Sequence, residues 1–389
     1  MSVVTAVRRT GGREGRLLRS ADTAVASRGG STFPWMAALV AILNLLGLVM
    51  VLSASSFSSL EDYRSPWYQF QRQLMWLVLA TVALLVTLRI DYHWWRRRVG
   101  LVLLVAGGLM FAVLIPGVGV SSNGASRWLG YGSLSIQPSE LAKLAVILYA
   151  ASVLARRADR CHDWRSTLRP VMIVFGVFAA LLMLQPNLGT TIILAAVVLA
   201  MLFVAGVPAK PLAVTFGTLG VAAAAAAVLE PYRFRRLMAF RNPWADPLNT
   251  GFQTIQSQVG LANGGVFGTG LGEGRAKWGF LPEAHTDFIY AIIGEELGLV
   301  GALTVVALFV ALALLGVRTA MRAPDRFGML IATGVTTWIL VQAFVNIGAV
   351  VGVLPITGVP LPFVSSGGSS LLFTMAATGV LLNVARQAR

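Results

Sequence analysis

Ten long apolar runs restrict the fold of this chain more than any other feature. A hydrocarbon layer about 30 Å thick is crossed by a helix of about 17–25 apolar residues. The composition agrees, because 56% of residues are hydrophobic and only 12% are charged, against about 25% charged in soluble domains. The sequence predicts an all-α integral membrane protein with about ten transmembrane helices. We expect them at 35–53, 73–88, 99–115, 139–155, 168–184, 188–206, 212–229, 288–317, 327–351 and 366–385.

Arginine placement predicts the orientation of these helices. Of the 31 Lys and Arg residues, 21 lie in loops on one side and nine on the other. Cytoplasmic loops collect such cations, so both termini are expected in the cytoplasm. Residues 1–34 are rich in Arg, Gly, Ser and Thr and are expected to form a disordered basic tail before a membrane domain at 35–387. This placement accounts for the net charge of +15, so no nucleic-acid partner is predicted.

A large extracytoplasmic loop, residues 230–286, is expected between the seventh and eighth helices. Its basic residues are unusual for the outer side, and an anionic partner such as a lipid phosphate would explain them. The alternative is that long translocated loops tolerate charge. Its glycines follow no predicted strand, so a flexible loop that folds over a substrate is favoured over a dinucleotide site. The six cations are Arg233, Arg235, Arg236, Arg241, Arg275 and Lys277.

The segment 281–290 places Glu283, His285 and Asp287 just before the eighth apolar run, which itself carries Glu295 and Glu296 about 12 Å deeper. Ionisable groups at a bilayer are costly and therefore indicate function. The alternative for Asp287 is an acid that complements the helix dipole. If the helix begins early, Glu283 and Asp287 share a face and repel, which raises a pKa; otherwise Glu283 is a solvated loop residue. His285 is expected to position other groups.

A second candidate segment runs from Arg127 to Lys143. Arg127 and Lys143 can present cations to a substrate anion, and Trp128 can anchor at the membrane interface. Gln137 precedes a proline, with Glu140 three residues on, which resembles a capping box at a helix start. Glu140 and Lys143 are three residues apart, so an ion pair along one helix face is the alternative to substrate binding.

The third candidate segment is Ser365 to Ser370, which leads into the last apolar run. Backbone N–H groups at a Ser- and Gly-rich helix start can bind an anion, whereas ordinary capping by serine is the alternative. The candidate residues are Ser365, Gly367, Gly368 and Ser369. All these segments are expected on the outer side, which predicts a single site. No metal site is predicted, since Cys161 and His162 alone cannot hold zinc.

At these residues the chain resembles the SEDS family (shape, elongation, division and sporulation) of RodA, FtsW and SpoVE type, and the FtsW type most. The chain departs from the usual pattern of that family at Asn187, where an acid is common, and at Ser366, where an aromatic residue is common. The matching segments are 50–55, 123–128, 137–143, 185–189, 282–288, 294–298 and 360–370.

The resemblance implies a peptidoglycan glycosyltransferase that polymerises lipid II on the outer face of the bacterial cytoplasmic membrane. Asp287 matches the catalytic acid proposed for the family, and its proposed substrate contacts match Arg127, Trp128, Glu140 and Lys143. The resemblance also implies a class B penicillin-binding protein as the transpeptidase partner. Other membrane proteins of the division machinery and a location at the septum would follow. No cofactor is required by the sequence, although Mg²⁺ or Mn²⁺ could accompany the lipid diphosphate.

The expected reaction is an inverting displacement in which Asp287 acts as the base. A sugar hydroxyl attacks an anomeric carbon, and polyprenyl diphosphate leaves. Arg127, Lys143, Arg236 and Arg241 are candidates for stabilising the departing charge. Glu283, His285 and the Ser365–Ser369 segment are candidates for substrate binding. Two other classes of function stay open: a transporter that flips lipid II, and a scaffold without activity that recruits a transpeptidase.

Overall fold

The computed structural model describes residues 32–122, 125–131, 134–158, 164–229 and 231–388, so most of the tail predicted at 1–34 lies outside it. The described chain is mainly helical. Its long helices are α2 (Thr32–Tyr63), α3 (Tyr68–Arg89), α4 (Tyr92–Ala112), α5 (Pro138–Arg156), α6 (Trp164–Leu184), α7 (Leu188–Val204), α8 (Ala209–Leu229), α11 (Ile289–Met321), α12 (Arg326–Val350) and α13 (Gly368–Gln387). These helices coincide with the ten predicted runs.

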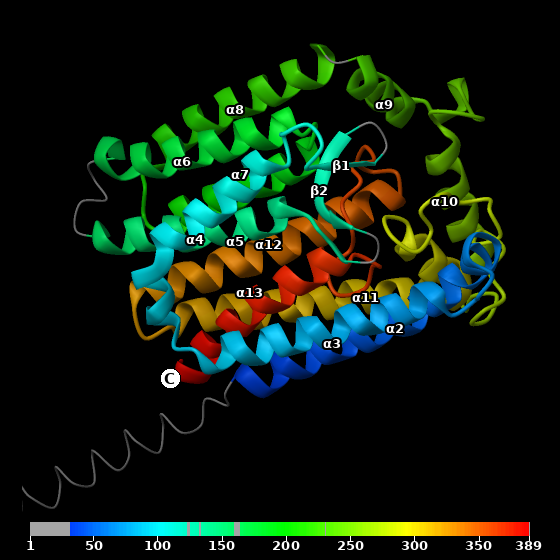
Figure 1. Ribbon diagram of the computed structural model, residues 1–389, viewed down its shortest axis with the longest axis horizontal. Coiled ribbons are helices and arrows are strands. Elements are labelled where there is room, and N and C mark those ends of the chain that lie inside the picture. Colours follow the sequence, from blue (N-terminus) through cyan, green and yellow to red (C-terminus); the bar gives the residue numbers. More distant parts are fainter. Residues whose placement is uncertain (1–31, 123–124, 132–133, 159–163, 230, 389) are drawn as a thin grey trace, which may run out of the picture.

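The long helices lie side by side along the longest axis of the molecule (Figure 1). Within the described residues, seven are long and apolar enough to cross a membrane: α2, α3, α5, α6 from Thr167, α11, α12 and α13. The shorter apolar helices are α7 and the Ala209–Ala225 part of α8. The predicted multi-pass membrane fold is therefore confirmed. α4 does not meet these limits, and its first turns carry Arg96, Arg97 and Arg98.

Polar residues at the helix starts explain where several helices begin. Asp91 accepts a hydrogen bond from the backbone N–H of His93 at 2.8 Å, and Asp325 accepts one from Gly328 at 2.8 Å. Asn187 caps α7 through Thr190. These side chains satisfy backbone donors that a helix start leaves open. The capping box predicted for α5 is wrong: Pro138 is at the first turn as expected, but Gln137 makes no side-chain cap.

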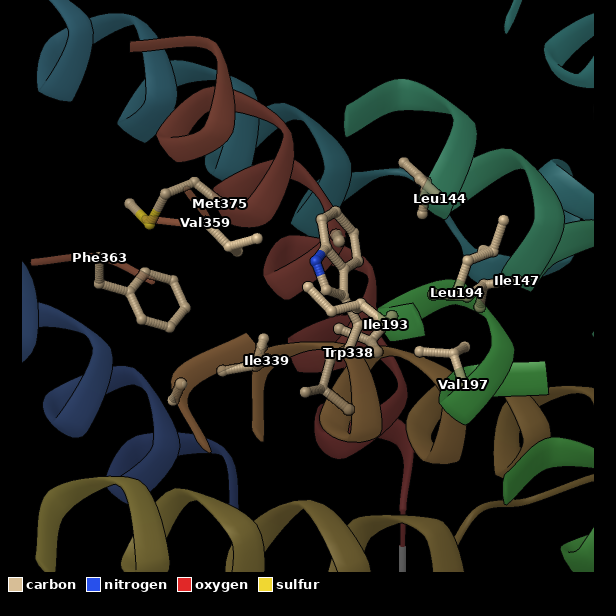
Figure 2. Close-up of a cluster of buried hydrophobic side chains, with 14 of the residues drawn as sticks. Leu144, Ile147, Ile193, Leu194, Val197, Trp338, Ile339, Val359, Phe363 and Met375 are labelled. Carbon is tan, nitrogen blue, oxygen red and sulfur yellow. The ribbon is translucent and has the colours of Figure 1, made fainter. Parts of the chain in front are cut away.

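α12 forms the centre of the packed core. It packs against α5, α7, α11 and α13, and α13 in turn packs closely along α3. Figure 2 shows Trp338 of α12 with Leu144 and Ile147 of α5 and Ile193 of α7 around it. Trp338 is fully buried. The polar residues that α12 carries are therefore held in a closely packed setting, which matters for the site described below.

A small antiparallel sheet, not predicted from the sequence, connects α4 to α5. Its strands are β1 (Val120–Ser122), β2 (Ala125–Tyr131) and β3 (Leu134–Ile136), in the order β1-β2-β3. Trp128 pairs with Val120, and Leu129 pairs with Ile136. The sheet places Arg127 on a strand instead of in an irregular loop.

The segment between α8 and α11, expected as a flexible loop at 230–286, is partly helical. It contains α9 (Pro231–Arg241), a short 3-10 helix η2 (Pro243–Ala245) and α10 (Phe252–Gly264), and α10 packs on α11. In Figure 1 these elements lie at the end of the bundle away from the C-terminus. α9 and α10 thus form a cap over that end.

Residues 265–270 insert into a break in α11. Gly298 has non-helical angles, with φ 66° and ψ −166°. Thr269 and Gly270 donate backbone hydrogen bonds to the carbonyls of Glu295 and Glu296, while Leu299 and Val300 donate to Gly265 and Val266. A side chain at Gly298 would overlap the backbone of residues 266–268. The glycines here allow the two backbones to approach closely. The hydrogen bonds between them satisfy the backbone N–H and C=O groups that the break in the helix exposes.

The two deep acids of α11 secure the same segment. The Glu295 carboxylate accepts backbone hydrogen bonds from Arg275 at 3.0 Å and Ala276 at 3.1 Å. Glu296 forms an ion pair with Lys277 at 2.7 Å and accepts a hydrogen bond from Ser53 of α2 at 2.7 Å. Glu295, Glu296 and Lys277 are buried, so Lys277 has an internal anionic partner in this structure.

Candidate active site

Asp287 lies in the turn before α11, which begins at Ile289, two residues later. Its side chain is half-buried and lines a small cavity with Asn346 and the segment 356–359. A side-chain atom at Gly358 would lie 3.5 Å from Asp287 Oδ2, so the carboxyl group faces this segment closely. The carboxyl group therefore opens toward a cavity instead of being enclosed by the core.

The electrostatic surroundings of Asp287 suit a base that works near neutral pH. The pKa of Asp287 is raised to about 7, mainly by burial and also by the charge of Glu283. The guanidinium groups of Arg236 and Arg127 lower the pKa and so oppose these effects. A carboxyl group with a pKa close to the working pH combines a useful deprotonated fraction with real basicity.

Glu283 and His285 belong to the same turn as Asp287 but not to its helix. Glu283 is exposed with φ 57° and accepts a hydrogen bond from the Thr286 hydroxyl at 2.7 Å. Glu283 therefore lies in a loop, which is the alternative that the sequence offered to a shared helix face, and its charge still raises the pKa of Asp287. Burial lowers the pKa of His285, and the charge of Arg72 lowers it as well. The charges of Glu283 and Asp62 act in the opposite direction and raise this pKa. The His285 carbonyl accepts a hydrogen bond from the backbone of Ser366 at 2.9 Å.

Arg127 is fixed by the turn between α6 and α7. Its Nε donates to the carbonyl of Gln185 at 2.9 Å and its Nη2 to the carbonyl of Pro186 at 2.8 Å. The neighbouring Trp128 is partly exposed on β2. Since Arg127 also acts on the pKa of Asp287, the structure brings together two residues that are 160 positions apart in the sequence.

The two arginines of α9 differ in their relation to Asp287. Arg236 is partly buried, and its Nη1 donates to the carbonyl of Ile356 at 3.4 Å, beside the cavity. Arg241 is exposed at the C-terminal end of α9 and is not among the groups that shift the pKa of Asp287. α9 therefore directs one of the two predicted cations toward the site.

Glu140 and Lys143 form a buried ion pair in the core of the bundle. Their charged atoms are 2.9 Å apart, and the side chains are 4% and 1% exposed. Lys143 also donates to Gln342 at 2.8 Å and lies 4.5 Å from the ring centre of Trp338. The ion pair that the sequence offered as the alternative to substrate binding is therefore present. Substrate contact by either residue stays a prediction, since neither side chain reaches the surface here.

The serines of the 365–370 segment are engaged inside the protein. Ser365 Oγ accepts a hydrogen bond from Leu361 at 2.8 Å, and Ser369 Oγ accepts one from Gln137 at 3.2 Å. Ser370 donates to Glu140 at 3.2 Å. α13 begins at Gly368 with Gly367 at its cap and no side-chain cap hydrogen bond, so the serine-capping alternative is wrong. Anion binding by this helix start stays a prediction.

The comparisons with known proteins agree with this geometry. Residues 34–389 match the family model described as cell cycle protein, which covers the FtsW, RodA and SpoVE proteins. The chain belongs to this family.

Among curated relatives of this FtsW/RodA/SpoVE protein is "Probable peptidoglycan glycosyltransferase FtsW" of Geobacter metallireducens. It is 44% identical over 88% of this chain and 91% of that protein. "Stage V sporulation protein E" of Bacillus subtilis is 41% identical over 90% and 96% of the two chains. A solved structure described as "Structural coordination of polymerization and crosslinking by a peptidoglycan synthase complex" shares 30% identity and a TM-score of 0.74, over 90% and 97% of the chains.

Sequence reasoning about this family member missed the polar face of α12. Gln342 and Asn346 are buried, four residues apart, and both donate to the segment that faces Asp287. Gln342 Nε2 donates to Pro360 at 3.0 Å, and Asn346 Nδ2 donates to Val359 at 2.8 Å. Two amides at helical spacing inside an apolar run were the available signal, because buried polar groups need partners.

Proposed function

We propose that the chain is a peptidoglycan glycosyltransferase that polymerises lipid II into glycan strands. The observation that carries the proposal is the half-buried Asp287, poised near neutral pKa beside Arg127 and Arg236. The names of the relatives that are 41–44% identical support the same activity.

The reaction is a single displacement with inversion. The hydroxyl group of one lipid-linked disaccharide attacks the anomeric carbon of the other, and the carboxylate of Asp287 takes the hydroxyl proton. The C–O bond to the diphosphate breaks, and the bonding electrons leave with the polyprenyl diphosphate. An α-linked diphosphate is replaced by a β-glycosidic bond, so no covalent intermediate on the protein is needed. General base catalysis of this kind contributes about 10²–10⁴-fold.

Arg127 and Arg236 stabilise the leaving group in this proposal. Arg127 and Arg236 are tied to backbone carbonyls at the edge of the site, so their charges are in place before the reaction. Such preorganised cations stabilise the negative charge that develops on the departing diphosphate. Arg241, Glu283, His285 and the 365–369 segment lie around the same end of the molecule and stay candidate substrate contacts.

Glu140 and Lys143 enter the proposal in a different way. For either group to reach the substrate, the start of α5 would have to move away from α12 and α13. Their contacts with Gln342 and Ser370 connect them to the segments that face Asp287. A supporting role therefore needs no rearrangement, whereas direct contact does.

The lipid parts of the substrates call for apolar surface near the site. A groove of about 680 Å³ lies between the last turns of α2 and residues 271–278, lined by Leu52, Phe57, Leu60, Trp67, Leu271 and Trp278, among others. Pockets of this size, mostly apolar with a few polar groups at one end, are typical of ligand sites. We assign this groove to a prenyl chain.

The setting and partners follow from the same proposal. The end that carries Asp287 faces outward, both termini are cytoplasmic, and the protein acts at the division septum with a class B penicillin-binding protein and other membrane proteins of the division machinery. A Mg²⁺ or Mn²⁺ ion would neutralise the lipid diphosphate. Within the described residues no group of three or more His, Cys, Asp or Glu side chains could hold a metal. Such an ion would be bound mainly by diphosphate oxygens, as is usual for Mg²⁺ at phosphates.

The decisive experiment measures glycan strands formed from lipid II by the purified protein, with and without its transpeptidase. Asp287→Asn should reduce the rate by about 10²–10⁴-fold. Glu273→Gln is the matched control, because Glu273 is an exposed carboxylate of the same segment. Near-normal polymer from Asp287→Asn would remove the carboxylate from the mechanism. Transfer of labelled lipid II across liposomes without any polymer would instead favour the transporter.

A further inference from the structure

Asn346 of α12 joins the two backbones that enclose the catalytic carboxyl group. Its Nδ2 donates to the carbonyl of Asp287 at 2.8 Å and to the carbonyl of Val359 at 2.8 Å. Both partners are carbonyl oxygens, which only accept hydrogen bonds, so the amide nitrogen must point toward them. The orientation of the amide is therefore determined, and its oxygen points away from these two carbonyls.

The amide oxygen of Asn346 is a buried hydrogen-bond acceptor. The side chain is 2% exposed, and Oδ1 has no hydrogen-bond partner within the described part of the protein. A buried acceptor without a partner costs about 1–3 kcal/mol, so natural proteins seldom keep one without a use. A hydrogen-bond donor that reaches Oδ1 would offset this cost.

The cavity shared by Asn346 and Asp287 suggests that use. Both residues line it, together with Gly358 and Val359, and the space left in it is about that of one water molecule. Asp287 Oδ2 lies against Gly358, next to the residue whose carbonyl Asn346 holds. Asn346 and Asp287 therefore border the same small space.

We propose that Asn346 is a positioning residue for the reaction at Asp287. Its nitrogen holds the main chain of Asp287 against the 357–360 segment. Its oxygen accepts a hydrogen bond from the carboxyl group of Asp287 after that group has taken the proton of the attacking hydroxyl, directly or through one water. The proton moves from the sugar oxygen to the carboxylate, and no other bond changes at this step. The inference rests on the base role of Asp287 in the proposed function.

The shift of the pH profile tests the inference. An acceptor that serves the protonated carboxyl group raises the pKa of that group, so its removal lowers it. Asn346→Ala should move the acid limb of the polymerisation rate to lower pH by about 0.5–1 unit, the equivalent of one hydrogen bond. The rate at the optimum should fall on the order of 10- to 100-fold, since the carboxyl group loses its anchor.

Asn44 of α2 provides a matched control. It is also buried, its Nδ2 donates to Val40 at 2.7 Å, and its Oδ1 likewise has no partner among the described residues. Asn44→Ala should lower thermal stability without moving the acid limb. If Asn346→Ala does not fold, Asn346→Ser, which keeps a polar group of smaller reach, is measured in the same way.

The possible results separate this inference from the proposed function. The inference is supported if the midpoint of the acid limb moves to lower pH in Asn346→Ala and does not move in Asn44→Ala. An unchanged midpoint with a reduced rate, or the same shift in Asn44→Ala, overturns it and leaves Asn346 a structural residue. If the wild-type protein forms no polymer, the proposed function fails as well, and that result is visible before any variant is compared.

Discussion

Replacing Lys143 with methionine tests whether the buried ion pair supports the fold or serves the substrate. Lys143 Nζ lies 2.9 Å from Glu140 and 2.8 Å from Gln342, and the Trp338 ring centre is 4.5 Å away. Methionine keeps much of the length and apolar surface of lysine but removes the charge. Glu140 would then keep the Ser370 hydroxyl, at 3.2 Å, as its remaining side-chain donor.

The size of the effect follows from the distance and the burial. At 2.9 Å and an effective dielectric constant of about 20, the attraction of the two charges is about 6 kcal/mol. Desolvation of both groups offsets most of this energy, but removing one partner leaves the other charge buried alone. The expected loss in the free energy of unfolding is about 3–5 kcal/mol. The double variant Glu140→Gln with Lys143→Met leaves no unpaired charge and should recover most of that loss.

The assay is equilibrium unfolding of the purified protein in detergent for wild type, both single variants and the double variant. Lys210→Met serves as the control, because Lys210 is exposed near the start of α8. A Lys143→Met protein within about 1 kcal/mol of wild type would refute the reasoning, because a lone buried carboxylate should cost more. If that stable variant also fails to use lipid II, Lys143 contacts the substrate.

Three further predictions concern the end of the molecule that carries Asp287 and the cap. The pKa of Asp287 is raised in the folded state, so the folded protein holds a proton that the unfolded chain has lost between about pH 4 and 7, and stability falls as pH rises through that window. Asp287→Asn should therefore be more stable than wild type at pH 8, by at most about 4 kcal/mol, and equally stable near pH 4. The free energy of unfolding of both proteins is measured at the two pH values. A variant that is less stable than wild type at pH 8 contradicts the prediction. Arg236→Gln removes a charge that lowers this pKa, so the acid limb of the polymerisation rate should move to higher pH, while Arg241→Gln should leave it unchanged. Gly298→Ala should expel the segment that fills the break in α11 and expose it to protease, whereas Gly108→Ala, which meets open space, should not.

The apolar runs predicted the helices well because the length of an apolar run is enough to identify a membrane-spanning helix. The ten runs all became helices, and Asp287 was found from its position at the start of one of them. α9 and α10 were missed because a long basic loop rich in glycine has no strong period. The strands of 120–136 were missed because two of the three have only three residues, too few to alternate visibly.

The supporting residues of the site lay beyond the reach of sequence patterns. An amide such as Asn346 in an apolar run has no visible partner until the fold brings Asp287 and Val359 to it from 59 and 13 positions away. The Glu140–Lys143 pair was expected near the membrane surface, since spacing shows that two charges can meet but not how deeply they are buried. The sequence allows Glu283 either at an early helix start or in the loop before the helix, and the structure has it in the loop because α11 begins six residues later.

The break in α11 has a mechanical consequence. Four backbone hydrogen bonds, two on each side of Gly298, connect the helix to residues 265–270, and Asp287 lies between those residues and the start of the helix. Through these bonds, residues 265–270 are connected to α11 on both sides of Gly298. The first half of α11, which begins two residues after Asp287, is therefore coupled to the segment that follows α10 as well as to its own second half.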